Sequence, residues 1–316
     1  MTVKHISLSV KRRSDTKHAS RATRYEIRDT NMLGYRHGFH AGNFADVHKH
    51  IILMLLLESL LKKNTPFCYV DSHAGAARYD LQSEFAQKNR EYENGIVRLL
   101  KTANPPAAIA SYLRAVETMN APQKKDRISL RYYPGSPALA RQLLRPQDRM
   151  ILMELHSTEA PKLKKYFAND HQVSVHHRDG YEGLNAMLPP EERRALVFID
   201  PSYEIKDEFA RLTETLIKIL RKWPTGIYAV WYPVQGNQPT ALFHNELRRS
   251  GIKNIYLNEI SVVPDTEPNR LSGSGVIIIN PPWRFDQILG AVMDWLAPVL
   301  DRGSHAPARS EWLVPE

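Results

Sequence analysis

Apolar and polar positions alternate in blocks along most of this chain. Five stretches carry apolar residues at the spacing of an amphipathic helix, and they span 44–62, 157–168, 205–222, 238–250 and 284–300. Seven shorter runs, rich in β-branched and aromatic residues, predict strands at 67–71, 149–156, 171–177, 194–200, 226–233, 252–260 and 275–280. Most of these runs are continuously apolar, which is typical of strands covered on both faces. The pattern predicts an α/β fold with an open, mostly parallel sheet of seven strands.

One long interval breaks this alternation. Between Asp80 and Arg149 lie about 68 residues with helical signatures, including "ENGIVRLLKTA" and "AAIASYLRAVETM". We interpret residues 81–131 as a helical insertion, a small subdomain on the rim of the sheet. Residues 32–80 then hold an N-terminal tail, the first helix and the first part of the core, and residues 132–316 hold the remainder of the core.

The first 31 residues differ from the rest. They carry eight Lys or Arg against three acidic residues and have almost no apolar periodicity. This composition predicts a disordered basic extension. An alternative is that the true start is Met32 and that residues 1–31 come from an upstream start codon. On either interpretation we assign no catalytic role to this segment.

Composition and charge narrow the class of protein. With 42% hydrophobic and 24% charged residues, the chain has the composition of an ordinary soluble globular protein. The longest apolar stretch, "IILMLLLESLL", is interrupted by Glu58 and is too short to cross a bilayer, so we expect no membrane association. Cys68 is the single cysteine, which fits a reducing cytoplasm. The net charge of +9 favours a polyanionic partner such as nucleic acid.

Acidic residues stand at or near the ends of four successive predicted strands. They are Asp71, which precedes "SHAGAA", Glu154, Asp179 in "RDG", and Asp200. Ligands bind beyond the carboxyl ends of parallel strands, so these acids are expected to share one site. A turn of small residues lets the backbone approach a ligand, and an acid can accept both hydrogen bonds of a ribose diol, as an adenosine-containing cofactor requires. The alternative is that acids and glycines are simply common where strands end, and "HAGAA" lacks the full dinucleotide fingerprint, which disfavours NAD.

The tetrad "DPSY" follows the fourth strand. An exocyclic adenine amine is a poor nucleophile, and the Asp200 carboxylate with the Pro201 carbonyl can each accept one amino hydrogen and aim the nitrogen lone pair at a methyl group. Tyr203 can stack on a flipped base. The tetrad is similar to the [Asp/Asn/Ser]-Pro-Pro-[Tyr/Phe/Trp] motif of amino-methyltransferases that use S-adenosylmethionine. Ser202 replaces the second proline, and we expect this to reduce rigidity without removing an acceptor.

A second tetrad, "NPPW" at 280–283, matches that motif better letter for letter. Asn280 ends the last predicted strand, whereas Asp200 ends a strand expected beside the first one. Position therefore favours Asp200 as the catalytic residue. For "NPPW" we expect a structural role, as a strand exit with a buried Trp283.

Most of the chain, from Met32 to Glu316, resembles the RlmJ family of bacterial methyltransferases, which act on N6 of one adenine in 23S ribosomal RNA. The resemblance lies in "MLGYRHGFHAGNFADVHKH", "DSHAGAARY", "RYYPGSPALARQLLR", "ELH", "RDG", "DPSYE", "TGIYAVWYPV" and "SGVIIINPPW". It implies a Rossmann-like methyltransferase core with a helical insertion, S-adenosylmethionine as the methyl donor, and 23S rRNA, naked or in an early assembly particle, as the partner. No obligate protein partner is expected, and a monomer is the simplest oligomeric state.

The resemblance also assigns residues, motif by motif. Asp200, with Pro201 and Tyr203, would be catalytic, and Tyr35 and His37 would lie near the substrate adenine. The cofactor contacts would be Lys49, His50, His73, Ser136, Glu154, Asp179, Gly180 and Asp200. A DNA adenine-N6 or protein-glutamine methyltransferase, which shares the tetrad, remains an alternative, and so does a catalytically silent RNA-binding protein.

Four histidines, at positions 37, 40, 48 and 50, lie within 14 residues. No cysteine accompanies them and few carboxylates are suitably spaced, so we expect no metal site. We expect His50 to hydrogen-bond the cofactor. His40 and His48 are expected to cap a helix or to face solvent.

Overall fold

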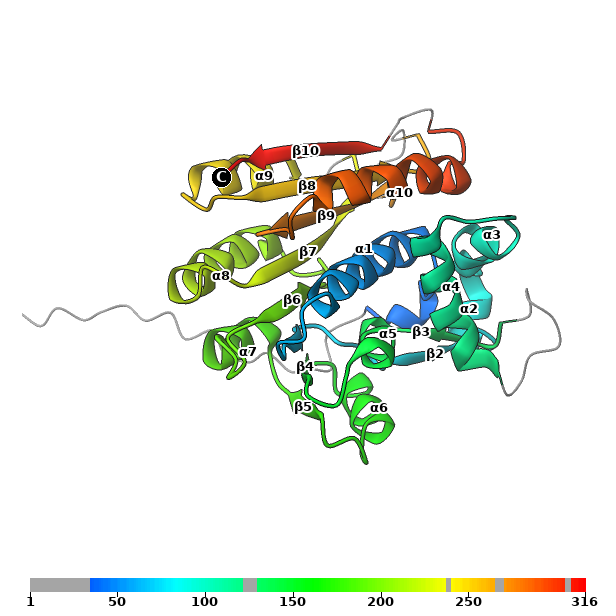
Figure 1. Cartoon of the computed structure of the whole chain (residues 1–316). Helices are drawn as coiled ribbons and strands as arrows, with labels where there is room; N and C mark the ends of the chain where they lie inside the picture. The colour runs from blue at the N-terminus through cyan, green and yellow to red at the C-terminus, as the bar shows by residue number, and fades with distance from the viewer. Residues whose placement is uncertain (1–34, 122–129, 237–239, 265–269, 305–307) are drawn as a thin grey trace, which may run out of the picture.

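The computed structural model describes residues 35–121, 130–236, 240–264, 270–304 and 308–316. The predicted basic extension, residues 1–31, lies outside this range. The described chain forms one large mixed sheet with helices on both of its faces (Figure 1).

The sheet has eight strands in the order β10-β8-β9-β7-β6-β1-β4-β5. The strands are β1 (Cys68–Asp71), β4 (Arg149–Glu154), β5 (Val173–His177), β6 (Ala195–Ile199), β7 (Ile227–Val234), β8 (Ile255–Ser261), β9 (Gly273–Ile279) and β10 (Arg309–Val314). The pairs among β5, β4, β1, β6 and β7 are parallel, while β9 runs antiparallel to β7 and to β8. All seven predicted strands are confirmed, in a mostly parallel sheet.

The eighth strand, β10, was not predicted. It pairs antiparallel with β8 at the edge of the sheet, and only Leu313 in it is buried. An edge strand with one buried residue has no apolar run to reveal it, so the expectation of seven strands was one too few.

Strand register brings the predicted acids to one edge. In β1, Asp71 lies opposite Leu152 of β4 and Phe198 of β6. The chain leaves β1 for β4 and β5 on one side and returns to β6 on the other, so the carboxyl ends of β1 and β6 flank a topological switch point. This is the place where open α/β sheets bind ligands.

Helices cover the two faces in separate layers. One face carries α1 (Phe44–Leu61), α5 (Ser136–Leu143), α6 (Glu159–Tyr166) and α10 (Phe285–Leu300). The other face carries α7 (Gly180–Met187), α8 (Glu208–Lys222) and α9 (Thr240–Arg249). Each layer packs on its own buried cluster of apolar side chains. Within the described part of the chain, no helix combines the length and the apolar character needed to cross a membrane.

Helix α1 is the central helix of its layer. Asn43 caps it, because the Asn43 side chain accepts a hydrogen bond from Asp46 N–H at 2.9 Å. Apolar residues surround the helix on all sides, and it packs against α4 (Ala107–Asn120), α5, α10 and the strands β6, β7 and β9. Its polar residues near the N-terminus are therefore buried beside the edge of the sheet that carries the acids.

A helical segment lies between two short paired strands, β2 (Arg78–Asp80) and β3 (Tyr132–Pro134). It contains α2 (Glu84–Asn89), the 3-10 helix η3 (Glu91–Asn94), α3 (Ile96–Leu100) and α4 (Ala107–Asn120). Another 3-10 helix, η2 (His37–Phe39), packs against α2. Figure 1 shows this helical group at the side of the sheet, next to one end of α1.

Candidate active site

A cleft opens at the carboxyl ends of β1, β4 and β6, and we call it the inner cleft. It is lined by every residue that the resemblance assigned to the cofactor, and also by Tyr35, His37 and Pro201. The cofactor residues in this cleft are Lys49, His50, His73, Ser136, Glu154, Asp179, Gly180 and Asp200. Residues from α1, from four strand ends and from the α5 N-terminus thus meet at one place.

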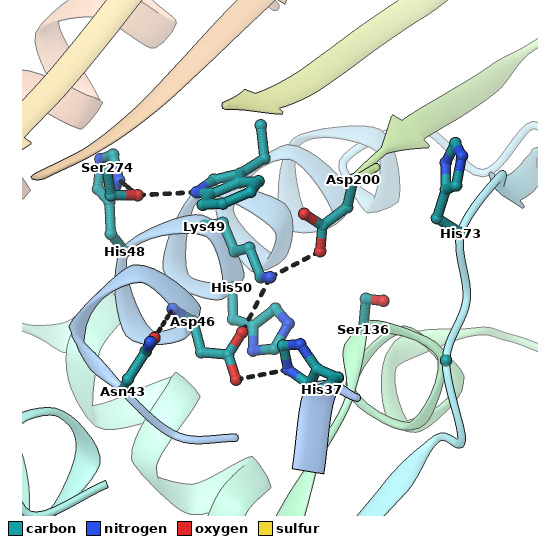
Figure 2. Close-up of polar contacts among 12 residues, drawn as sticks. His37, Asn43, Asp46, His48, Lys49, His50, His73, Ser136, Asp200 and Ser274 are labelled. Atoms are coloured by element: carbon teal, nitrogen blue, oxygen red, sulfur yellow. Dashed lines mark hydrogen bonds and ion pairs between the residues drawn. The ribbon is translucent and has the colours of Figure 1, made fainter. Parts of the chain in front are cut away.

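Lys49 joins two carboxylates at the mouth of the inner cleft (Figure 2). Its ammonium nitrogen lies 2.6 Å from Asp200 Oδ2 and 2.9 Å from Asp46 Oδ1. Burial alone would lower the pKa of Lys49, but Asp200 and Asp46 outweigh burial, and the pKa is raised. The lysine is therefore a fixed cation. Its ammonium contacts two acids of the site, Asp46 and Asp200.

Asp46 was not predicted, and it organises the tail ahead of α1. Its Oδ2 accepts a hydrogen bond from Gly42 N–H at 2.8 Å and lies 2.9 Å from His37 Nε2. Burial raises the pKa of Asp46, but His37 and Lys49 lower it by more than burial raises it. The pKa of Asp46 is therefore well below its usual value. Tyr35 O–H lies 2.8 Å from His37 Nδ1. Through His37, hydrogen bonds therefore link Asp46 to both residues assigned to the substrate.

Asp71 is fully buried beneath the cleft floor. Its Oδ2 accepts hydrogen bonds from Tyr69 O–H at 2.7 Å and from Ser136 O–H at 2.8 Å. Burial raises the pKa of Asp71 to about 7, against the opposing effect of these donors. The Ser136 hydroxyl proton is thus used by Asp71, which leaves the Ser136 oxygen as an acceptor toward the cleft.

Glu154 closes the far side of the cleft. Its Oε2 accepts from Gly75 N–H at 2.8 Å and its Oε1 accepts from His156 N–H at 2.6 Å. Burial raises the pKa of Glu154, while the two backbone donors act in the opposite direction. Each oxygen keeps a second lone pair, so the carboxylate can still accept from two hydroxyl groups.

Asp179 and Gly180 form the start of α7. Asp179 Oδ1 accepts from Glu182 N–H at 3.0 Å, and its Oδ2 pairs with an Arg211 nitrogen at 2.9 Å. At Gly180 a Cβ would lie 2.2 Å from the Ser72 carbonyl oxygen, so only glycine allows this close approach of the two backbones.

Two cleft histidines are held neutral by burial. Burial lowers the pKa of His73 to about 4 and that of His50 to about 3. His50 Nδ1 lies 2.8 Å from Tyr133 O–H, and His73 Nδ1 lies 2.8 Å from Ser72 O–H. Their remaining nitrogens are oriented by these contacts and serve as neutral hydrogen-bonding groups.

A second hollow, the side pocket, adjoins the inner cleft and shares Tyr35, His37, Lys49 and Ser202 with it. Its other lining residues include Asp46, Tyr203, Trp231, Arg270 and Arg302. Asp200 belongs to the inner cleft and Tyr203 to the side pocket, so the "DPSY" loop separates the two hollows.

Tyr203 has a fixed position in this loop. Its backbone is in the left-handed region, with φ of 56°, and its hydroxyl donates to the Trp231 carbonyl oxygen at 2.6 Å. The Tyr203 and Trp231 rings meet edge to face, 5.8 Å apart. The Lys49 ammonium lies 5.0 Å from the centre of the Trp231 ring, a cation–π contact. Trp231 is a further site residue that the sequence did not reveal.

The four clustered histidines have four different environments. His37 pairs with Asp46, His40 with Glu91 at 3.0 Å, and His50 with Tyr133. His48 was expected to cap a helix or face solvent, and that expectation was wrong. Its side chain is fully buried, and Ser274 Oγ and Asn258 Oδ1 lie 2.8 and 2.7 Å from its two nitrogens. Among the described residues, no three potential metal ligands are gathered at one point.

The tetrad "NPPW" lies at the opposite edge of the sheet. Since β9 is antiparallel to β7, Asn280 follows the end of β9 that pairs with the start of β7. The Asn280 side chain donates to the carbonyl oxygens of Pro224 and Gly226 at 2.7 and 2.8 Å. Asn280 stands at a strand exit, as expected, but the expectation of a buried Trp283 was wrong, because this side chain is 86% exposed.

Comparison with known proteins agrees with this geometry. A family model described as "Ribosomal RNA large subunit methyltransferase D, RlmJ" matches residues 64–314. The chain belongs to the RlmJ family. It is 42% identical over 285 residues to "Ribosomal RNA large subunit methyltransferase J" of Escherichia coli, covering 90% of this chain and 100% of that protein. The protein of the same name from Haemophilus influenzae is 41% identical, with the same coverage.

A solved structure is also similar. The crystal structure of a Legionella pneumophila protein has a TM-score of 0.76 and 36% identity, and the match covers 86% of this chain and 97% of that one. This chain is therefore similar to the Legionella protein in both sequence and fold over most of its length.

Proposed function

We propose that this protein transfers a methyl group from S-adenosylmethionine to N6 of an adenine in 23S rRNA. Membership of the RlmJ family supports the class of reaction and of substrate. The observation that carries the proposal is the position of Asp200, which ends β6 between the inner cleft and the side pocket. A hydrogen-bond acceptor at that border lies between the proposed places of the methyl donor and of the adenine amine, which must meet for transfer.

The residues of the inner cleft fit S-adenosylmethionine by their chemistry. Glu154 offers lone pairs to a ribose diol, and Asp179 beside Gly180 offers a carboxylate where the backbone is close. The Lys49 and Asp46 charges are satisfied within the protein, so the cleft keeps an acidic lining suited to a sulfonium cation. When bound, S-adenosylmethionine supplies an electrophilic methyl group.

The residues of the "DPSY" loop then orient the nucleophile. The Asp200 carboxylate accepts one hydrogen of the adenine amine and the Pro201 carbonyl accepts the other, so the nitrogen lone pair points toward the methyl group. Lys49 holds Asp200 Oδ2, which leaves Oδ1 as the free acceptor. The nitrogen gains a methyl group and gives up a proton, for which Asp200 is the nearest base.

The side pocket is the proposed place of the adenine base. Tyr203 stands at its wall with Trp231, and Tyr35 and His37 close its other side. Arg270 and Arg302, also in this pocket, are exposed and carry the positive charge that attracts RNA phosphates. Shape and charge at this hollow thus suit a nucleotide taken out of its stack.

The test is methylation of defined substrates with radiolabelled S-adenosylmethionine. The substrates are 23S rRNA from cells lacking the gene, early ribosomal particles, duplex DNA, and protein fragments rich in glutamine. We expect label in 23S rRNA, with N6-methyladenosine as the product on mass spectrometry. Label in DNA or protein alone would exclude the proposal, and calorimetry without any S-adenosylmethionine binding would favour a catalytically silent RNA-binding protein.

A further inference from the structure

A buried polar chain links α1 to the wall of the side pocket. His48 of α1, Asn258 of β8 and Ser274 of β9 are each fully buried, and they form hydrogen bonds among themselves inside an apolar layer. Figure 2 shows His48 and Ser274 together, on the side of Lys49 away from His73. Polar groups placed so deeply are costly unless every one has a partner. Such a network serves to fix one arrangement of side chains.

The direction of each hydrogen bond in this network follows from the bond between Asn258 and Ser310. Asn258 Nδ2 donates to Ser310 Oγ at 2.7 Å, so Asn258 Oδ1 faces His48 Nε2 and accepts from it. His48 Nε2 therefore carries the hydrogen, and Nδ1 is an acceptor. Ser274 then donates its hydroxyl hydrogen to His48 Nδ1 and has lone pairs left.

The last link is Trp231. Its indole Nε1–H donates to Ser274 Oγ at 2.9 Å. The Trp231 ring lies under the Lys49 ammonium. The backbone carbonyl of Trp231 accepts a hydrogen bond from the Tyr203 hydroxyl. The indole thus contacts the Lys49 ammonium and the Tyr203 ring, and its N–H is held by the hydrogen bond to Ser274. Trp231 lines the side pocket, whereas it is absent from the lining of the inner cleft.

We propose that His48 and Ser274 are positioning residues that hold the Trp231 indole, and through it Lys49 and Tyr203, in the geometry that methyl transfer to the adenine requires. This inference rests on the proposed function and adds residues outside the two hollows to it. Without the Ser274 hydroxyl, the part-buried indole N–H loses its acceptor and the buried His48 Nδ1 loses its donor, so the indole is held less firmly. Because Trp231 lines the side pocket and not the inner cleft, we expect the larger effect on the RNA half of the site.

The decisive experiment is a double-mutant cycle between Ser274→Ala and Trp231→Phe. Phenylalanine keeps a ring beside Lys49 but has no N–H, so it has no bond to Ser274. We expect Ser274→Ala to lower the single-turnover rate on 23S rRNA roughly tenfold, as expected for a buried donor left unpaired. In the Trp231→Phe background the same change should lower the rate less than about twofold. The dissociation constant for S-adenosylmethionine should change less than about twofold in every variant.

Two further measurements keep the inference testable if Ser274→Ala folds poorly. His48→Leu replaces the imidazole with an apolar side chain and removes the acceptor of the Ser274 hydroxyl, so it should give a similar loss of rate. Fluorine NMR of protein labelled with 5-fluorotryptophan, with the Trp231 signal assigned from Trp231→Phe, should show that signal shifted in both variants. Ser59→Ala is the matched control, because it removes another α1-associated hydroxyl bond, to Leu55 O, far along the helix.

The outcomes are distinguishable from those of the proposed function. If the unmodified protein methylates no RNA, the proposed function fails, while the fluorine signal still reports whether Ser274 holds Trp231. If RNA is methylated but the effects of the two substitutions multiply, Ser274 acts independently of Trp231 and the positioning role is overturned. An unchanged Trp231 signal in Ser274→Ala would overturn it as well.

Discussion

The Lys49 ammonium lies 2.6 Å from Asp200 Oδ2, and this ion pair joins the first helix of the core to the loop that follows its fourth strand. Both side chains are largely buried, at 4% and 14% exposure. Asp200 is therefore held in one orientation before any ligand binds, with one oxygen occupied and the other available. In an enzyme whose work is mainly positioning, a carboxylate fixed in this way reduces the entropy lost when the amine is oriented.

Substitution of Asp200 by alanine should abolish methyl transfer. The acceptor for the adenine amine is lost, so we expect the rate to fall by roughly a thousandfold or more, in the range reported for loss of a key catalytic group. Cofactor affinity should change only a few-fold, because Glu154, the acceptor proposed for the ribose diol, is unchanged. The matched control is Asn280→Gly in "NPPW", which should keep the rate within about twofold. A large loss in that control would mean that the choice between the two tetrads is wrong.

Glu154 should affect binding more than chemistry. Glu154→Ala removes the acceptor proposed for the ribose diol and leaves Gly75 N–H and His156 N–H without their carboxylate. We expect the dissociation constant for S-adenosylmethionine to rise roughly 10- to 100-fold in calorimetry, as expected for loss of charge-assisted hydrogen bonds. The rate at saturating cofactor should fall only a few-fold. Glu182→Gln, on the exposed face of α7, is the control. Equal losses of affinity in Asp200→Ala and Glu154→Ala would contradict this division of roles.

Asp46 should matter for both stability and turnover. Asp46→Asn leaves the buried Lys49 with one carboxylate instead of two and weakens the contact that holds His37. Removing one partner from a buried ion-pair network costs about 3 kcal/mol or more of unfolding free energy. We also expect transfer to slow roughly tenfold, because Lys49 is then drawn onto Asp200. Urea unfolding and single-turnover assays test this, with Asp170→Asn as the control, because its ion pair with Arg141 is more exposed than the Lys49 pairs. Unchanged kinetics would show that Asp46 is only structural.

Asp71 gives stability a dependence on pH. Its folded pKa of about 7 lies above the value of about 3.9 for an unfolded aspartate. The carboxyl of Asp71 thus stays protonated to a higher pH in the folded protein than in the unfolded chain. Its contribution to stability is full below about pH 4 and is lost as pH rises to about 7. Relative to Asp71→Asn, the unfolding free energy of the unmodified protein should fall by roughly 2 to 3 kcal/mol between pH 5 and pH 8.

Asp148 is the control for this measurement. It is also buried, and burial raises its pKa, but hydrogen bonds from Arg145 outweigh burial and the net shift is downward. A lowered pKa gives stability that is lost only when pH falls through that low value. The difference between the unmodified protein and Asp148→Asn should therefore be flat from pH 5 to pH 8. A flat profile for Asp71→Asn as well would mean that Asp71 is ionised throughout.

The features that the sequence revealed are those set by local patterns. Asp71, Glu154 and Asp200 end apolar strands, and parallel strands bring such ends together regardless of the details of packing. Asp46 carried only a weak local signal, its spacing of three residues from Lys49 on one helix. The link from His48 to Ser274 joins positions 226 residues apart in the sequence. A periodic pattern in the sequence cannot predict such a contact, because the contact depends on which strand α1 crosses.

The two failed expectations about burial, for His48 and for Trp283, have the same cause. An apolar strand that continues into "PPW" favours burial of Trp283, and a helical pattern around His48 says nothing of which face meets the sheet. Burial of a single side chain is decided by the packing of neighbouring elements, which a local sequence pattern does not report. β10 was missed for the complementary reason, because its residues are mostly exposed at the sheet edge.

Ser202 is the point where the tetrad departs from its common form, and we expect restoration of proline there to be tolerated. The residue lines both hollows, and in the described part of the chain its N–H has no backbone acceptor, so a proline ring removes no such hydrogen bond. The two acceptors proposed for the amine, on Asp200 and Pro201, are unchanged. Ser202→Pro should keep the single-turnover rate within about threefold of that of the unmodified protein. The proline ring should also restrict the conformations open to the loop.

The matched variant is Ser202→Gly, which makes the same loop more flexible without adding a side chain. If stiffness at this position assists transfer, the rate should decrease in the order proline, serine, glycine, while the affinity for S-adenosylmethionine stays constant. A sharp loss of rate in both Ser202→Pro and Ser202→Gly would show instead that the Ser202 hydroxyl contacts the substrate, because both variants remove that group while preserving both acceptors. Adding Ser202→Thr, which keeps a hydroxyl, distinguishes this outcome from a steric effect of the ring.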